Sequence, residues 1–180
     1  AGAVLSTVAT IVQLTVLLAA TSTATLLALA VPLACAGAAA ILYGGIFTVL
    51  ALRHKVEQQD EPGHAFSLRS ALLFAALLSA ILLASAALQD WAGNAGVLAV
   101  AGLAGLADTH SAAISVAALV ASDRLSAQAA VVPILAAVTT NTLTKAIFAF
   151  TGGGTAFALR VVPGLILVIA AAWAGARFLG

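Results

Sequence analysis

The residues of this sequence with the greatest chemical potential are charged or strongly polar side chains inside long apolar runs. Asp108 lies near the middle of a stretch over about 93–121, and Lys145 lies in a stretch over about 127–150, with Asn141 one helical turn before it. A charged side chain at the centre of a bilayer costs at least about 2.5–3.5 kcal/mol and normally faces a partner, an ion or water. The two stretches are joined by a short connection, so the sequence predicts a pairing of Asp108 with Lys145.

Helical spacing adds further polar side chains to this site. Asp108, Ser111 and Ser115 follow i, i+3, i+7 spacing and share one helix face, as do Asn141 and Lys145 at i, i+4. Two facing polar faces could line a hydrated path or hold a cation through oxygen ligands, with Lys145 as an exchanging counter-charge. The alternative for the Ser and Thr side chains is interhelical hydrogen bonding, worth about 0.6 kcal/mol each. The predicted ion-binding or solute-binding residues are Asp108, His110, Ser111, Asn141, Thr142 and Lys145.

The metal assignment within this set is open. Asp108 and Asn141 are the candidate ligands, and Mg²⁺ is consistent with oxygen ligands although it usually keeps several waters. His110 could titrate near neutral pH or ligate a metal, or it could be a satisfied structural histidine. No cofactor is predicted beyond a bound cation.

The stretch that carries Asp108 is rich in glycine. Gly93, Gly96, Gly102 and Gly105 precede the aspartate, and each glycine weakens a helix by about 1 kcal/mol relative to alanine. Discontinuous helices of this kind expose backbone groups to solutes at mid-membrane in transporters. The alternative is that the glycines permit close helix packing.

A second glycine-rich element, Gly152-Gly153-Gly154, predicts a tight turn, because no Gly-Lys-Ser/Thr follows it as in a phosphate loop. Its exposed amides together with Arg160 could form a small rim that attracts anions. Hydrolytic motifs such as Gly-x-Ser-x-Gly and His-Glu-x-x-His do not occur, and no second mid-membrane aspartate could pair with Asp108. We therefore predict that the protein is not an enzyme.

The elements that position these residues follow from composition. Hydrophobic residues make up 63% of the chain, charged residues only 7%, and the mean hydropathy is +1.19. Soluble domains are about half apolar and about one quarter charged, and a membrane span needs about 20 apolar residues. Continuous runs rich in Ala and Leu favour helices over barrel strands. The sequence predicts an all-α polytopic membrane bundle of about six helices, forming one domain over 1–180.

The six predicted segments cover about 4–20, 24–52, 68–88, 93–121, 127–150 and 156–178. The only strongly polar stretch, about 53–67, is predicted to be a loop. If all six segments alternate in direction, this loop, Arg124 and Arg177 share one face, which the excess of Lys and Arg identifies as cytoplasmic. The chain opens with Ala-Gly-Ala and contains no Met, which indicates a piece of a longer polypeptide.

A faint internal repeat relates the two ends of the chain. A shift of about 132 positions aligns Thr7, Thr10 and Gln13 with Thr139, Thr142 and Lys145, aligns Thr23 with Thr155 and, with one gap, aligns Pro32 with Pro163. Each copy would be a polar-spotted helix, a short turn and a helix with an early proline. Transporter sites often lie between such repeats. Because four spans separate the copies, the prediction is that they share one orientation.

The runs Gly105-Leu106-Ala107-Asp108-Thr109-His110-Ser111 and Thr140-Asn141-Thr142-Leu143-Thr144-Lys145 resemble a known family. They are similar to the uncharacterised bacterial membrane domain that commonly follows an MgtC/SapB-type membrane domain. The likeness covers most of the chain and is strongest from about Gly93 to the end, and the MgtC/SapB part itself is absent. The resemblance implies a bacterial inner-membrane protein, truncated here, with ion or small-solute transport as its activity.

These observations lead to two functional predictions. The first is a transporter or channel-like protein for a small ion, such as a divalent cation, bound at mid-membrane. The second is a non-transporting membrane subunit or regulator that binds another membrane protein through small-residue helix faces. A homo-oligomer or a partner membrane domain is expected besides the lipid bilayer, and the net charge of +1 does not indicate a nucleic-acid partner.

Overall fold

The computed structural model describes residues 2–53 and 96–179, together with six isolated positions between residues 72 and 83. The described part is all helical and contains no strand. Its helices are α1 (Gly2–Thr21), α2 (Thr23–Arg53), α4 (Val97–Ala107), α5 (Thr109–Ala121) and α6 (Ala127–Ala174), followed by the π-helical turn η2 (Gly175–Leu179). The predicted loop at 53–67 and the predicted third segment at 68–88 lie outside the described residues, apart from Arg53 and those isolated positions.

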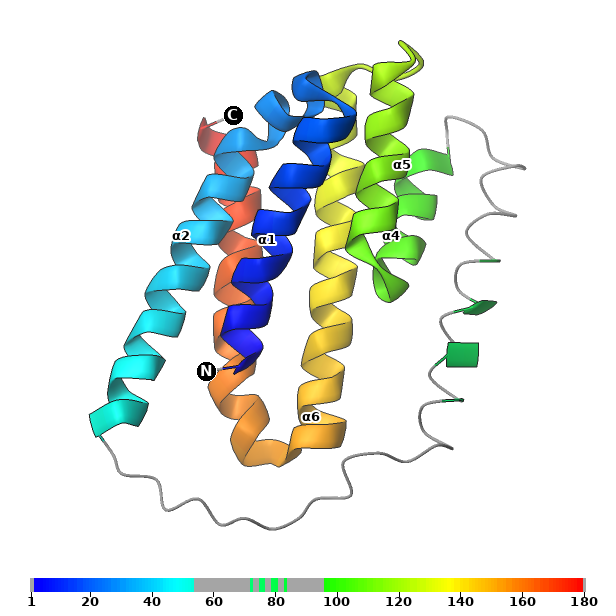
Figure 1. Ribbon diagram of the computed structural model, residues 1–180. Coiled ribbons are helices and arrows are strands. Elements are labelled where there is room, and N and C mark those ends of the chain that lie inside the picture. The colour runs from blue at the N-terminus through cyan, green and yellow to red at the C-terminus, as the bar shows by residue number, and fades with distance from the viewer. Residues whose placement is uncertain are drawn as a thin grey trace.

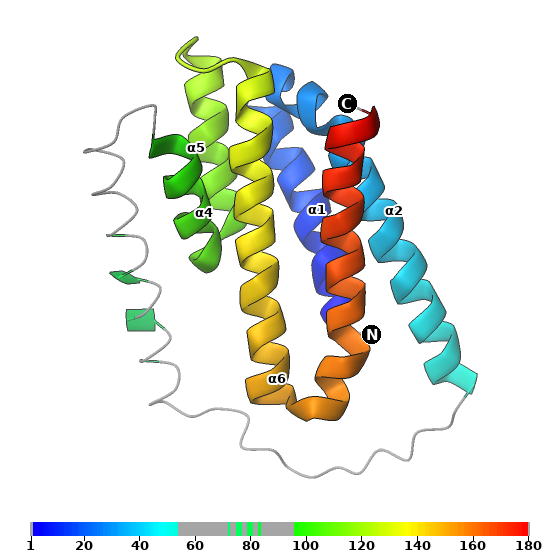
Figure 2. The same ribbon diagram turned by 180° about the vertical axis from the view of Figure 1, so that it is seen from behind.

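The helices pack as a bundle in which α1 and α2 form one antiparallel pair and α6 forms another by folding back on itself (Figures 1 and 2). The first pair confirms the predicted segments one and two and the short connection at Ser22. The fold-back of α6 is at Gly154, whose φ of 74° and ψ of 167° lie in a region that essentially only glycine occupies. The predicted glycine-rich turn is therefore confirmed, and Gly154 is the residue that makes it.

The predicted fourth segment is discontinuous, but it is not one span. Helix α4 runs about halfway down the bundle, the chain reverses at Asp108, and α5 runs back beside α4 (Figure 1). The two helices have 11 and 13 residues, each shorter than the about 20 that cross a bilayer. Asp108 has an extended backbone (φ −156°, ψ 119°) and caps α5, which gives the reversal its local cause.

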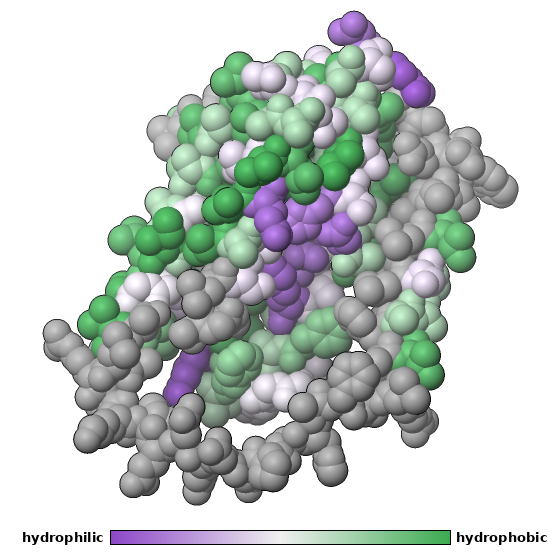
Figure 3. All heavy atoms as spheres, viewed as in Figure 1, coloured by the Kyte–Doolittle hydropathy of each residue, from purple (hydrophilic) through white to green (hydrophobic). Residues whose placement is uncertain are grey.

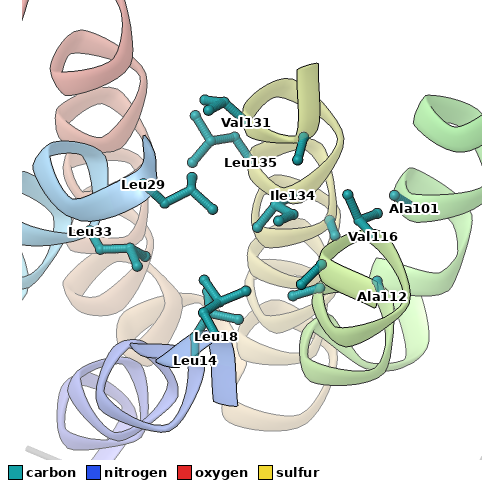
Figure 4. Close-up of a cluster of buried hydrophobic side chains, with 14 of the residues drawn as sticks. Leu14, Leu18, Leu29, Leu33, Ala101, Ala112, Val116, Val131, Ile134 and Leu135 are labelled. Carbon is teal, nitrogen blue, oxygen red and sulfur yellow. The ribbon is translucent and has the colours of Figure 1, made fainter. Parts of the chain in front are cut away.

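The core is built from medium-sized aliphatic side chains and alanines contributed by all five helices (Figure 4). Leu14 and Leu18 of α1, Leu29 of α2, and Ile134 and Leu135 of α6 are at most 1% exposed. Alanines fill the contacts nearer α4 and α5, where the backbones approach more closely. Because the buried side chains there are small, the α4–α5 hairpin can lie directly against α6.

The outside of the bundle is also apolar. Leu27 and Leu42 of α2 are 69% and 66% exposed, which a membrane environment would cover. Among the described residues, two helices are long and apolar enough to cross a membrane, over Thr23–Phe47 and Ala127–Phe178. The all-helical fold is thus confirmed, whereas the six predicted spans are not.

The hairpin also changes the predicted orientation of the chain. Helix α2 ends at the lower end of the bundle in Figure 1, whereas the α5–α6 connection and the C-terminus lie at the upper end. The shared face predicted for the loop after Arg53, for Arg124 and for the C-terminus is therefore wrong. The reason is that the stretch 97–121 enters and leaves on the same side, so the alternation assumed from six spans breaks there.

The same reversal corrects the predicted orientation of the internal repeat. Helix α1 runs upward and α2 downward, whereas the first leg of α6 runs downward and its second leg upward (Figure 1). The two segments that the predicted repeat aligns therefore have opposite orientations, and the prediction that they share one orientation is wrong. An inverted pair of two-helix units, with a short hairpin packed against α6 and against α1, is the arrangement that positions the site.

Candidate functional site

The break between α4 and α5 is held by the side chain of Asp108. Its Oδ1 accepts from the His110 backbone N–H at 3.0 Å, and its Oδ2 accepts from the Ser111 backbone N–H at 2.9 Å and from the Ser111 hydroxyl. These bonds satisfy N–H groups that the first turn of a helix leaves unpaired. The carboxylate is therefore the N-cap of α5. Ser115 donates to the Ser111 carbonyl at 2.8 Å, and the common face predicted for Asp108, Ser111 and Ser115 stays a prediction.

His110 completes this cluster. Its Nδ1 lies 3.0 Å from Asp108 Oδ1, so the imidazole shares the carboxylate with the backbone. Its Nε2 is buried and has no hydrogen-bond partner within the described part of the chain. Asp108 and His110 are 40% and 26% exposed at their side chains, so the cluster lies at the edge of the bundle and not in its interior.

The predicted pairing of Asp108 with Lys145 is wrong. Lys145 donates from Nζ to the Thr10 hydroxyl oxygen of α1 at 3.0 Å, and no acidic side chain among the described residues lies within ion-pair distance of it. The reversal at Asp108 directs the carboxylate to the start of α5, while Lys145 extends across to α1. The two charges that the sequence pairs thus belong to different clusters.

A small cavity with a mostly apolar lining lies beside Lys145. Its volume is about 20 Å³, which is room for about one water molecule. Its polar lining comes from α1, α5 and α6 and consists of Thr7, Thr10, Thr109, Asn141, Thr142 and Lys145. The predicted placement of Asn141 and Lys145 on one helix face is confirmed, because both side chains reach this cavity.

Two of the threonines that line this cavity donate their hydroxyl hydrogens to backbone carbonyls. Thr10 donates to the Ser6 carbonyl at 2.8 Å and Thr142 to the Val138 carbonyl at 2.7 Å. Their hydroxyl oxygens therefore keep only acceptor capacity toward the cavity. The Lys145 ammonium and the Asn141 amide are N–H donors that line the cavity.

The broken hairpin is fixed at the depth of this cavity by contacts with α6. Thr144 donates to the Leu106 carbonyl at 3.2 Å, which occupies one of the free carbonyls at the end of α4. Thr109, only 1% exposed, donates to the Ala137 carbonyl at 3.4 Å. A methyl group at Gly105 would overlap the Ala137 carbonyl oxygen and the Thr140 hydroxyl, so glycine is required for this close approach.

On the other side of Lys145 lies a larger, open groove of about 260 Å³. Its lining is Ser6, Lys145, Phe148, Ala149, Phe157, Val161 and Leu165. Lys145 is the one residue that lines both the groove and the small cavity. The Lys145 side chain therefore borders both an open groove and a small internal cavity.

The surface reflects this arrangement. On the face seen in Figure 1, hydrophilic atoms gather at mid-height and are surrounded by apolar atoms (Figure 3). The hydrophilic patch lies over the region where α1 and α5 approach α6, which is the depth of both clusters.

The predicted site residues therefore divide into two clusters. Asp108, His110 and Ser111 form the cap of α5, and Asn141, Thr142 and Lys145 line the cavity. Three polar lining residues were not predicted as site residues, namely Thr7, Thr10 and Thr109. The repeat was the available signal, because it aligned Thr7 and Thr10 with the polar positions of α6.

Two further predictions concern metals and the rim. Within the described residues, no group of three or more His, Cys, Asp or Glu side chains could hold a metal ion, and a cation at Asp108 and Asn141 stays a prediction. Gly152, Gly153, Gly154 and Arg160 are all exposed, and the Arg160 carbonyl accepts from the Tyr43 hydroxyl at 2.9 Å. An anion-attracting rim at these residues also stays a prediction.

Comparison with known proteins gives one match. A family model described as "Domain of unknown function (DUF4010)" matches residues 1–153. The match includes α1, α2, the α4–α5 hairpin and the first leg of α6, and thus the six polar residues that line the cavity. No curated protein and no solved structure matches the chain.

Proposed function

The chain belongs to the DUF4010 family of domains of unknown function, and from that premise we propose that it is a membrane-embedded transport protein for a small charged solute. The solute would pass through the region around Lys145. The observation that carries the proposal is the charged Lys145 beside a small, mostly apolar cavity between α1, α2, α5 and α6, at mid-height in an apolar bundle. Its ammonium group has no acidic partner among the described residues.

A membrane location is supported by the apolar surface. Two described helices have the length and composition of spans, and large aliphatic side chains point outward along them. In water this surface would favour aggregation, whereas in lipid it costs nothing. The bacterial inner membrane and the neighbouring MgtC/SapB-type domain belong to the proposal on the strength of the sequence resemblance alone.

Transport is supported by the way the cavity is built. A charged group at this depth is costly, so it is retained where it meets a solute, an ion or water. Broken helices and inverted two-helix units are the two devices by which secondary transporters form a site that can open to either side. Here both devices meet at the same cavity, since Thr109 follows the break and Thr10 and Thr142 come from opposite units.

The rival function is a subunit that binds another membrane protein through small-residue faces. The principal such face, Ala101 and Gly105 on α4, is buried, and Gly105 packs on Ala137 of α6 within the chain. That contact leaves these small residues unavailable to a partner. The transport proposal is therefore the better supported of the two.

The test is a flux assay in proteoliposomes with the full chain. We expect Lys145→Gln to lower solute flux about 100-fold, and Arg124→Gln, which removes a positive charge at the exposed α5–α6 connection, to leave it unchanged. Thermal unfolding of each variant checks that the fold survives. Equal flux through Lys145→Gln and the wild-type protein, or the absence of any solute flux in the wild type across a panel of ions and small organic ions, would overturn the proposal.

A further inference from the structure

We infer that the solute is a small organic anion, with a carboxylate-type head that binds Lys145 and an apolar body that occupies the open groove. This inference rests on the proposed function, because it names the substrate class of the same site. It follows from three properties of the two spaces beside Lys145, namely their charge, their size and the chemistry of their walls.

The charge of the site favours an anion. Lys145 is the only charged side chain that lines either space, and no acidic residue is among the lining residues of either. Asp108 cannot neutralise it, because both of its carboxylate oxygens accept bonds within the cap of α5. The ammonium has three N–H donors, and one of them is directed to Thr10. An incoming anion would take up the remaining donors and compensate a charge that is costly at this depth.

The sizes of the two spaces determine where the ligand lies. The inner cavity of about 20 Å³ accepts about one water molecule, so only a monatomic ion or water could enter it. The groove of about 260 Å³ is just below the about 300–1,000 Å³ of typical small-molecule sites. A ligand larger than water that contacts Lys145 must therefore lie in the groove.

The walls of the groove determine the nature of the ligand. Apart from Lys145 and Ser6, its lining is entirely hydrophobic and includes the rings of Phe148 and Phe157. A hydrated inorganic anion such as chloride would lose water there and gain few donors in exchange. An apolar body would instead gain about 25 cal/mol for each Å² of surface removed from water. A charged head at one end and apolar contacts along the rest are the features of an organic monoanion.

Two sources could supply this chemistry, a soluble carboxylate or the head of an anionic lipid. The groove volume favours the soluble source, because about 260 Å³ encloses a small molecule and not a two-chain lipid. We therefore use benzoate as the probe, with benzyl alcohol as its uncharged counterpart of the same ring.

The experiment measures equilibrium binding of labelled benzoate to the full chain in zwitterionic phosphatidylcholine nanodiscs. We expect saturable binding of benzoate, at least tenfold weaker binding of benzyl alcohol, and no displacement by chloride at equal concentration. Lys145→Gln should lower the affinity for benzoate at least tenfold. Ser6→Phe keeps the charge but fills the groove beside it, and should lower the affinity similarly, whereas Arg124→Gln should not change it.

Four outcomes would overturn the inference. They are equal binding of benzoate and benzyl alcohol, displacement by equimolar chloride, unchanged affinity in Lys145→Gln, and abolition of binding by small amounts of phosphatidylglycerol, which would assign the groove to a lipid head. Flux is measured separately. Benzoate binding without any flux would refute the proposed transport function and leave the ligand class standing, whereas flux of another solute without benzoate binding would refute the ligand class alone.

Discussion

The two charged residues that the sequence places inside apolar runs are treated in opposite ways by the fold. Asp108 is surrounded by donors from its own helix, so its charge is satisfied locally by His110 and Ser111. Lys145 finds one neutral hydroxyl, on another helix, and no described acidic partner. The comparison shows that an ionisable residue in an apolar run can either cap backbone N–H groups or stay available to a ligand. Which role it takes depends on the groups that contact it.

The largest effect should come from removing the unsatisfied charge. Lys145→Gln keeps the length and polarity of the side chain but removes its charge, and we expect solute flux to fall about 100-fold, or about 2.7 kcal/mol. Thermal unfolding in detergent should shift little or toward higher stability, because no described ion pair is lost. A large loss of stability with unchanged flux would mean that Lys145 is structural, and the contrast with Asp108 would disappear.

The second largest effect on flux and stability should come from the contact of Gly105 with α6, which fixes the position of the break between α4 and α5. Gly105→Leu places a side chain where even a methyl group overlaps Ala137 and Thr140, and overpacking of this kind costs about 2 kcal/mol. We expect a matching decrease in the free energy of unfolding and a loss of flux, as α4 moves away from α6. Gly102→Leu is the matched control, because a Cβ at Gly102 meets nothing within 4 Å. Equal stability of the two variants would contradict the described packing of α4 on α6.

Asp108 should respond to the loss of its cap and not to the loss of its charge. Asp108→Ala removes the acceptor for the first turn of α5 and should lower the free energy of unfolding by about 1 kcal/mol. Asp108→Asn retains a good N-cap and should unfold almost like the wild-type protein. Flux through Asp108→Asn should stay close to that of the wild type. A flux loss as deep as that of Lys145→Gln would return Asp108 to the transport site and restore the pairing expected from sequence.

Much of the fold could be predicted from hydropathy, and the helix break could be predicted from Gly102, Gly105 and Asp108. The direction of the chain after the break could not, because a glycine-rich stretch of 97–121 is compatible with a kinked span and with a hairpin. That choice depends on the contact of Gly105 with α6, which is a tertiary feature. The wrong choice then produced the wrong orientation for the repeat and for the basic residues.

The site was predicted in part for a similar reason. Asn141 and Lys145 follow from helical spacing, which is local. Thr10 could not be identified as the partner of Lys145, because that contact joins residues 135 positions apart and requires that α1 lie against α6. A charge at one end of a chain does not reveal which neutral residue at the other end will face it.

The smallest effect is expected at Thr10, the partner of Lys145, where a substitution should raise the affinity for benzoate instead of lowering it. Thr10→Val removes the hydroxyl that accepts from Lys145 but keeps the shape of the side chain. The ammonium then has one more free donor, and a hydrogen bond of this kind is worth about 0.5–1.5 kcal/mol. We therefore expect benzoate to bind to Thr10→Val roughly two- to fivefold more tightly than to the wild-type protein, which corresponds to the lower part of that energy range. Thr15→Val is the matched control, since Thr15 lies on the same helix and donates only to the Ile11 carbonyl. Weaker binding in Thr10→Val than in Thr15→Val would mean that Thr10 positions Lys145 and does not compete for it, so that the ammonium depends on its neighbours much as Asp108 does.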